Sequence, residues 1–86
     1  MNKYERQPEY VLDLHGRTVR EAEHALKGLL EKNFSHVRVI VGKGLHSKVG
    51  PILRDAVKEF FRTQGIRFTQ SKISDGGEGA LEVFFT

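Results

Sequence analysis

The stretch YVLDLHG, residues 10–16, decides the fold of this chain. Its first part is short and rich in β-forming residues, so it predicts a strand over residues 10–14, which His15 and Gly16 end. Asp13 and His15 lie two positions apart, so their side chains point to one face of the strand, and the leucines beside Asp13 point to the other. The strand therefore has a core face and a face that carries a carboxylate beside an imidazole.

Helices and strands alternate downstream of this strand. Thr18 and Glu21 have the spacing of a capping box, and apolar residues at three- and four-residue steps follow them. Pro51 suits the first turn of a second helix, and Gly65 suits its C-terminal cap. The predicted elements are strands at residues 10–14, 36–41, 66–73 and 80–85, and helices at residues 18–32 and 51–65.

The order β-α-β-α-β-β predicts an α/β (α+β) two-layer sandwich. Strands joined through single helices pair in parallel by right-handed crossovers. Two helices do not cover both faces of a four-stranded sheet, so we expect a mixed sheet with both helices on one face and the other face open. We expect residues 1–9 to form a flexible tail and residues 10–86 to form one domain.

Composition excludes several classes of protein. The chain has 86 residues and no cysteine, which excludes disulfides, cysteine-bound zinc, iron–sulfur clusters and a cysteine nucleophile. No apolar run approaches the ~18 residues of a membrane span. The first nine residues are polar and charged, unlike a signal peptide, so we expect a cytoplasmic protein.

The positive charge lies in the middle of the chain. Lys and Arg number 14 against 11 Asp and Glu, and within residues 17–72 they exceed the acidic residues by seven. A basic segment of this kind favours a polyanion as partner. On charge alone, an ordinary solvated basic surface remains the alternative.

Glycines cluster after the first two strands and before the last one. The carboxyl ends of parallel strands share one edge of a sheet, and ligands bind there. Glycine permits positive φ and close approach of a ligand, and runs of free loop amides bind anions. We therefore expect one edge to gather Gly16, Gly42, Gly44, Gly76, Gly77 and Gly79.

Asp13 and His15 are the candidate catalytic residues at that edge. The pair suits acid–base chemistry, with Asp13 orienting His15, and it also suits two ligands of a divalent metal. A hydrogen-bonded turn without further function is the third interpretation. His36, at the start of a strand, is expected to be solvated.

Several cations flank the glycine loops. Gly42-Lys43-Gly44 lacks the spacing and the Ser or Thr of a P-loop, so ATP binding is not expected. The side chains expected to contact nucleic acid are those of Arg17, Lys43, His46, Lys48 and Arg54.

Three motifs, LDLHG at 12–16, VRVIVGKG at 37–44 and GGEGA at 76–80, together resemble the Smr (small MutS-related) domain. The resemblance implies a stand-alone Smr domain protein with a fold similar to the C-terminal domain of translation initiation factor three. It also implies nucleic-acid binding and an endonuclease that nicks DNA or cuts RNA. The family's cleavage motif corresponds to Asp13 and His15, and its Gly-x-Gly binding loop to Gly42, Lys43 and Gly44.

Two positions depart from that family pattern. Val41 stands where the family often has Thr or His, and Leu81 where it often has Thr. The resemblance thus implies one polar group fewer at the site.

The leading interpretation is a nucleic-acid endonuclease in which His15 moves a proton at the scissile phosphodiester. It requires no cofactor, although Mg²⁺ or Mn²⁺ held by Asp13 and His15 is a variant of it. The partner is then DNA or RNA, including branched or structured forms, bound by a monomer or a weak dimer. The alternatives are a non-catalytic nucleic-acid- or ribosome-binding module and a protein adaptor that uses the open sheet face.

Overall fold

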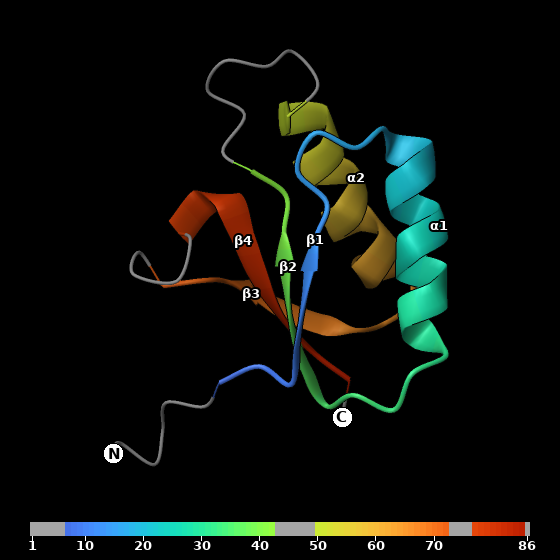
Figure 1. The fold of residues 1–86 in the computed structure, drawn as a ribbon, viewed down its shortest axis with the longest axis vertical. Helices are drawn as coiled ribbons and strands as arrows, with labels where there is room; N and C mark the ends of the chain where they lie inside the picture. Colours follow the sequence, from blue (N-terminus) through green and yellow to red (C-terminus); the bar gives the residue numbers. More distant parts are fainter. Residues whose placement is uncertain (1–6, 43–49, 73–76, 86) are drawn as a thin grey trace.

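The computed structural model describes residues 7–42, 50–72 and 77–85 (Figure 1). The elements follow the predicted order, and a short 3₁₀ helix, η2, stands where we expected a loop. They are β1 (Tyr10–Asp13), α1 (Val19–Leu30), β2 (His36–Ile40), α2 (Gly50–Thr63), β3 (Arg67–Gln70), η2 (Gly77–Gly79) and β4 (Ala80–Phe84).

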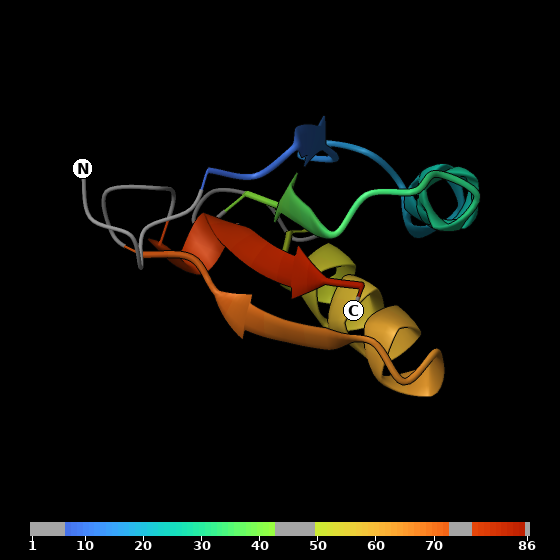
Figure 2. The same ribbon diagram turned by 90° about the horizontal axis from the view of Figure 1, so that it is seen from below.

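The four strands form one mixed sheet in the order β1-β2-β4-β3. β1 runs parallel to β2, and β4 runs antiparallel to both β2 and β3. Both helices pack on the same side of the sheet, which gives the two layers that the sequence predicted (Figure 2). β1 and β3 are therefore the edge strands.

Alternation along each strand separates the core from the open face. On β2, Val37 and Val39 are fully buried, while His36, Arg38 and Ile40 between them are half-buried. The buried positions of β2 pair with buried positions of β4, so one face of both strands packs against the helices. The main core residues are Leu14, Leu26, Leu29, Val37, Val39, Val41, Leu53, Val57, Phe61, Leu81 and Val83.

Local hydrogen bonds and backbone angles account for the helix ends. The capping box at the start of α1 is confirmed, since Thr18 Oγ1 accepts from the Glu21 amide and the Glu21 carboxylate accepts from the Thr18 amide. α1 ends at Leu30, two residues before the predicted end. Gly65 has φ +71°, which is the left-handed conformation that a glycine cap supplies after α2.

The end of β3 and the start of the domain also differ from the prediction. β3 ends at Gln70, although we expected a strand to residue 73, and the Lys72 carbonyl accepts from the Gly77 amide. Glu9, which we placed in the tail, is bonded to the sheet. Its amide donates to His36 O at 2.8 Å, and its carboxylate accepts from the amides of Ser35 and His36. In the described part of the chain, neither helix has the length and hydropathy needed to cross a membrane.

Candidate functional site

The site begins where β1 ends beside β2. Asp13 pairs with Ile40 in the parallel ladder, and the Leu14 amide donates to Ile40 O at 2.7 Å. The chain then turns through Gly16, whose φ is +78°, and the Arg17 amide closes the turn on Leu14 O. This turn leads directly into the capped start of α1, so the site residues are held between two regular elements.

Asp13 and His15 form a hydrogen-bonded pair on the face away from the helices. His15 Nδ1 lies 2.5 Å from Asp13 Oδ1, and the His15 amide donates to the same oxygen at 3.1 Å. The hydrogen bond from the His15 side chain, assisted by its amide and by the charge of Arg17, holds the pKa of Asp13 below its ordinary value despite some burial. Asp13 is therefore ionised at neutral pH, and both side chains remain accessible, with 50% of Asp13 and 69% of His15 exposed.

Gly42 lies next to this pair and is bonded to Gly79. The amides of Val41 and Gly42 both donate to Gly79 O, at 2.8 and 3.0 Å, so the end of β2 is tied to the start of β4. Gly42 has φ +81°, and a Cβ at this position would lie 3.3 Å from the Cβ of His15. The glycine thus lets the loop approach the imidazole closely.

Two of the described loop amides do not serve as we expected. Gly42 N–H donates to Gly79 O, and Gly77 N–H donates to Lys72 O. These two amides are therefore not the free anion donors that the sequence predicted. Gly42 and Gly77 instead supply positive φ angles, which permit the tight path of the chain at this edge.

Two of the predicted cations are placed by the structure. Arg17 is exposed directly after the turn, and Arg54 is half-buried near the start of α2. α1 and α2 both begin at the edge where β1 and β2 end, so the positive ends of both helix dipoles lie there (Figure 1). The first turn of α2 has no acidic residue. The other predicted contacts lie outside the described residues: Lys43, Gly44, His46, Lys48 and Gly76.

The two departures from the family pattern do not lie on the site face. The side chain of Val41 is 1% exposed and that of Leu81 is 2% exposed, and both belong to the core that packs against the helices. Asp13 and His15 lie on the opposite face of the sheet. The expected loss of a polar site group at position 41 is therefore wrong, because that position faces the core.

The pair alone offers few ligands to a metal ion. Zinc sites normally supply at least three protein ligands, whereas Mg²⁺ is usually held by one or two carboxylates with water and substrate phosphates, so the predicted Mg²⁺ or Mn²⁺ stays a prediction. Within the described ranges, no third His, Cys, Asp or Glu joins Asp13 and His15 in a metal-binding group. The Asp13 oxygen is also already bonded to the imidazole, so we derive no step through a metal.

The sequence did not reveal a second polar cluster, on the open face. His36 was expected to be solvated, but its side chain is only 14% exposed and its Nε2 lies 2.6 Å from Glu82 Oε1. Arg38 Nε donates to Glu82 Oε2 at 2.7 Å, and Ser71 Oγ donates to the same oxygen. Burial raises the pKa of Glu82, but these three hydrogen bonds outweigh it and hold the pKa below its ordinary value. No sequence signal marks this cluster, because it depends on the pairing of β2 with β4.

Comparisons with known proteins point to one family. The family whose model matches is described as the Smr domain, over residues 12–86. Endonuclease NBR9 of Saccharomyces cerevisiae is 37% identical over 75 residues, which is 81% of this chain and 30% of that protein. The chain thus spans less than a third of this relative's length.

Solved Smr domains have the same fold. The Smr domain of Thermus thermophilus MutS2 is 30% identical with a TM-score of 0.75, over 87% of this chain and 95% of that one. The B3BP Smr domain is 31% identical with a TM-score of 0.72, over 92% of this chain and 80% of that one.

Proposed function

The chain belongs to the Smr domain family, and from this membership we propose that it is an endonuclease that cleaves phosphodiester bonds of nucleic acid. Smr domains bind nucleic acids generally. The observation that carries the proposal is the 2.5 Å contact between His15 Nδ1 and Asp13 Oδ1 on an accessible edge. The endonuclease activity named for the yeast relative supports the same conclusion.

His15 acts as the general base. With a proton on Nδ1, the imidazole donates to Asp13 Oδ1, which leaves the lone pair on Nε2. Nε2 takes the proton from the attacking hydroxyl, which belongs to water on DNA and is the 2′-hydroxyl on RNA. The attacking oxygen bonds to phosphorus as the bond to the leaving oxygen breaks, and the leaving oxygen takes a proton from water. The hydroxide that this releases removes the proton from His15 Nε2, which restores the base.

Asp13 orients the imidazole and stabilises its charged form. Its lowered pKa keeps the carboxylate ionised at neutral pH. The negative charge therefore stabilises the positive charge that His15 gains during the reaction. Gly42 supports this arrangement because the absence of a Cβ lets the loop pass close to His15.

Arg17 and Arg54 hold the phosphate backbone. Contacts to phosphate position a nucleic acid but carry no base information, so we expect little sequence preference. Arg17 follows the site turn directly, and Arg54 lies near the start of α2 at the same edge. The positive ends of the helices add to the field that attracts the phosphates.

The test measures cleavage of labelled single-stranded RNA, single-stranded DNA and branched DNA by the wild-type chain, Asp13→Asn and His15→Ala. We expect each substitution to lower the cleavage rate by about 10²–10⁴-fold on the substrate that is cut. His24→Ala is the matched control, since it removes another exposed histidine, from the middle of α1. Equal rates for the wild type and both site variants would refute the site.

Binding and metal dependence are measured in parallel. Salt-dependent binding of the same oligonucleotides with no cleavage would support a binding module instead of a nuclease. We expect cleavage to persist in EDTA, because neither proton transfer in this mechanism requires a metal ion. Cleavage that requires Mg²⁺ or Mn²⁺ would contradict this metal-free step while leaving Asp13 and His15 as site residues.

A further inference from the structure

The two edges of the sheet are protected differently. Beside β3, the Arg67 guanidinium lies 4.6 Å from the ring centre of Phe84, and Arg62 lies 5.7 Å from that of Phe68. Charged side chains of this kind normally keep an edge strand from pairing with other chains. β1 instead presents Tyr10 and Val11, each 44% exposed, which are two of the three exposed large hydrophobic residues in the described ranges.

The outer side of β1 offers unpaired backbone groups. The Leu14 amide donates inward to Ile40 O, and β1 is the first strand of the sheet order. Because donors alternate along a parallel pair, the N–H and C=O groups of Val11 and Asp13 point away from β2. In the described part of the chain, no further strand pairs with this side.

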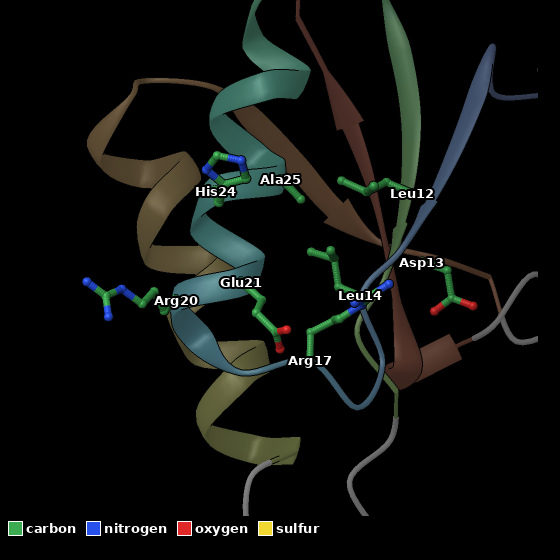
Figure 3. Close-up of a pocket in the computed structure, with 8 residues that line it drawn as sticks. All are labelled: Leu12, Asp13, Leu14, Arg17, Arg20, Glu21, His24 and Ala25. Carbon is green, nitrogen blue, oxygen red and sulfur yellow. The ribbon is translucent and has the colours of Figure 1, made fainter.

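A groove runs along this edge between β1 and α1. It consists of two stretches of about 570 and 550 Å³ that share Leu12 and Ala25 as apolar lining. Figure 3 shows the first stretch, in which Leu12 and Leu14 point toward α1 while the Asp13 carboxylate points away from the helix. The second stretch ends at Phe34, whose ring stacks on that of Tyr10 at 5.2 Å.

The charges along the groove balance. Three fully charged cations and three carboxylates line it, and Glu21 is already committed to the capping box. A polyanion finds no net positive charge here, whereas a segment of low net charge meets no repulsion. The charged and titratable lining residues are Arg17, Arg20, His24 and Lys32 against Asp13, Glu21 and Glu31.

Gly28 gives a second, independent indication that a segment binds in the groove. It lies inside α1 and lines the second stretch of the groove. Glycine weakens a helix interior, yet its φ here is not positive, and a Cβ would meet nothing within 4 Å beyond its own stretch of helix. Within the described residues, no contact or backbone angle requires glycine at this position. A helix surface without a side chain at this position does allow the backbone of a bound segment to approach closely.

We propose that an extended, apolar-rich peptide segment of a partner protein, with little net charge, adds to β1 as a fifth strand in this groove. Its backbone bonds the outward groups of Val11 and Asp13, and alternate side chains enter the apolar lining at Leu12 and Ala25. This role goes beyond nucleic-acid cleavage. It gives the domain a docking surface that passes next to the cleavage site.

The test begins with random peptides of about ten residues, enough to span one strand. Peptides are selected by display on the full chain, then synthesised and titrated. We expect saturable binding by sequences with alternating apolar residues and slower amide hydrogen exchange at Val11 and Asp13 in the complex. Failure to obtain any peptide that binds saturably would overturn the proposal.

Three variants distinguish an effect on docking from an effect on folding. Gly28→Leu should raise the melting temperature, because leucine favours the helix, and yet raise the peptide Kd by about tenfold or more, because it fills the groove. Lys27→Leu, one position earlier and outside the groove lining, should leave the Kd unchanged. Val11→Pro removes an outward N–H that an edge strand does not need, and it should raise the Kd by about tenfold.

Gly28→Leu should cleave nucleic acid at the wild-type rate. Its effects on peptide Kd, on dimerisation and on oligonucleotide affinity distinguish a peptide from other occupants of the groove. An unchanged Kd for both Gly28→Leu and Val11→Pro would refute the groove. A concentration-dependent dimer that Gly28→Leu dissociates, seen by sedimentation, would show that a second copy fills it. Loss of single-stranded oligonucleotide affinity in Gly28→Leu would show that nucleic acid does, and either result would overturn the peptide proposal.

Discussion

At the scale of single residues, the site depends on how His15 is held between two neighbours. Asp13 Oδ1 bonds both its ring and its amide, and Gly42 lies close to its Cβ. The exposed imidazole therefore has a defined orientation, although it lies in a turn and not in a strand. A small change in the loop after β2 reaches the candidate base directly.

Gly42→Ala should lower both stability and cleavage. A residue other than glycine at φ +81° costs about 1–2 kcal/mol, and the new Cβ would lie 3.3 Å from that of His15. The imidazole must then shift relative to Asp13, so we expect slower cleavage in addition to a lower melting temperature. The loss of cleavage is measured at a temperature at which the variant is folded, and thermal denaturation measures the loss of stability.

Gly65→Ala is the matched control for that substitution. Gly65 has φ +71°, but a Cβ there would meet nothing within 4 Å. It should therefore lose similar stability and keep the wild-type cleavage rate. If both variants cleave at the wild-type rate, the contact with His15 has no catalytic importance.

At the scale of elements, the start of α1 is what anchors the site turn. The capping box between Thr18 and Glu21 satisfies amides at the helix start, and the turn through Gly16 enters this helix directly. Hydrogen bonds from Thr18 hold the pKa of Glu21 below its ordinary value, as expected for a carboxylate that caps a helix. The site is thus attached to a regular element on each side.

Thr18→Ala should destabilise the domain by about 1 kcal/mol, because it removes the side-chain acceptor at the N-cap. Urea denaturation measures the change. Thr18→Ser keeps the hydroxyl and should stay close to the wild type. An equal loss of stability in both variants would mean that the capping hydrogen bond contributes nothing.

At the scale of the whole molecule, Glu82 joins three strands across the open face. It accepts from His36 and Arg38 on β2 and from Ser71 just after β3, while it lies on β4 itself. Its side chain is only 13% exposed, so these bonds are poorly replaced by water. The cluster holds β2, β3 and β4 together on the side that the helices leave uncovered.

Glu82→Gln should cost about 1–3 kcal/mol of stability at pH 7. Since the pKa of Glu82 is lower in the folded chain than its ordinary value of about 4.5, the carboxylate stabilises the fold above that pH. This contribution is lost as the pH falls below about 4.5 through the lowered pKa. Denaturation between pH 7 and pH 3 should therefore show a smaller gap between the wild type and Glu82→Gln at the acid end. A constant gap would contradict the link to the Glu82 charge.

Much of the fold and part of the site follow from local patterns. The order of elements, the capping box of Thr18 and Glu21, and the shared face of Asp13 and His15 all depend on spacing along the chain. The predicted ends of α1 and β3 lay beyond the observed ones, because no glycine or proline directly follows Leu30 or Gln70 to mark the end. The roles of Asp13 and His15 in cleavage remain predictions.

The sequence by itself determined which residues face the core and that a carboxylate and an imidazole share one end of β1, because these depend on the short-range periods of helix and strand. Only the tertiary structure decided that Gly42 donates its amide to Gly79 and lies against His15, and that Glu82 gathers His36, Arg38 and Ser71. Those contacts join residues up to 46 positions apart, so they exist only once the strands of the sheet have paired.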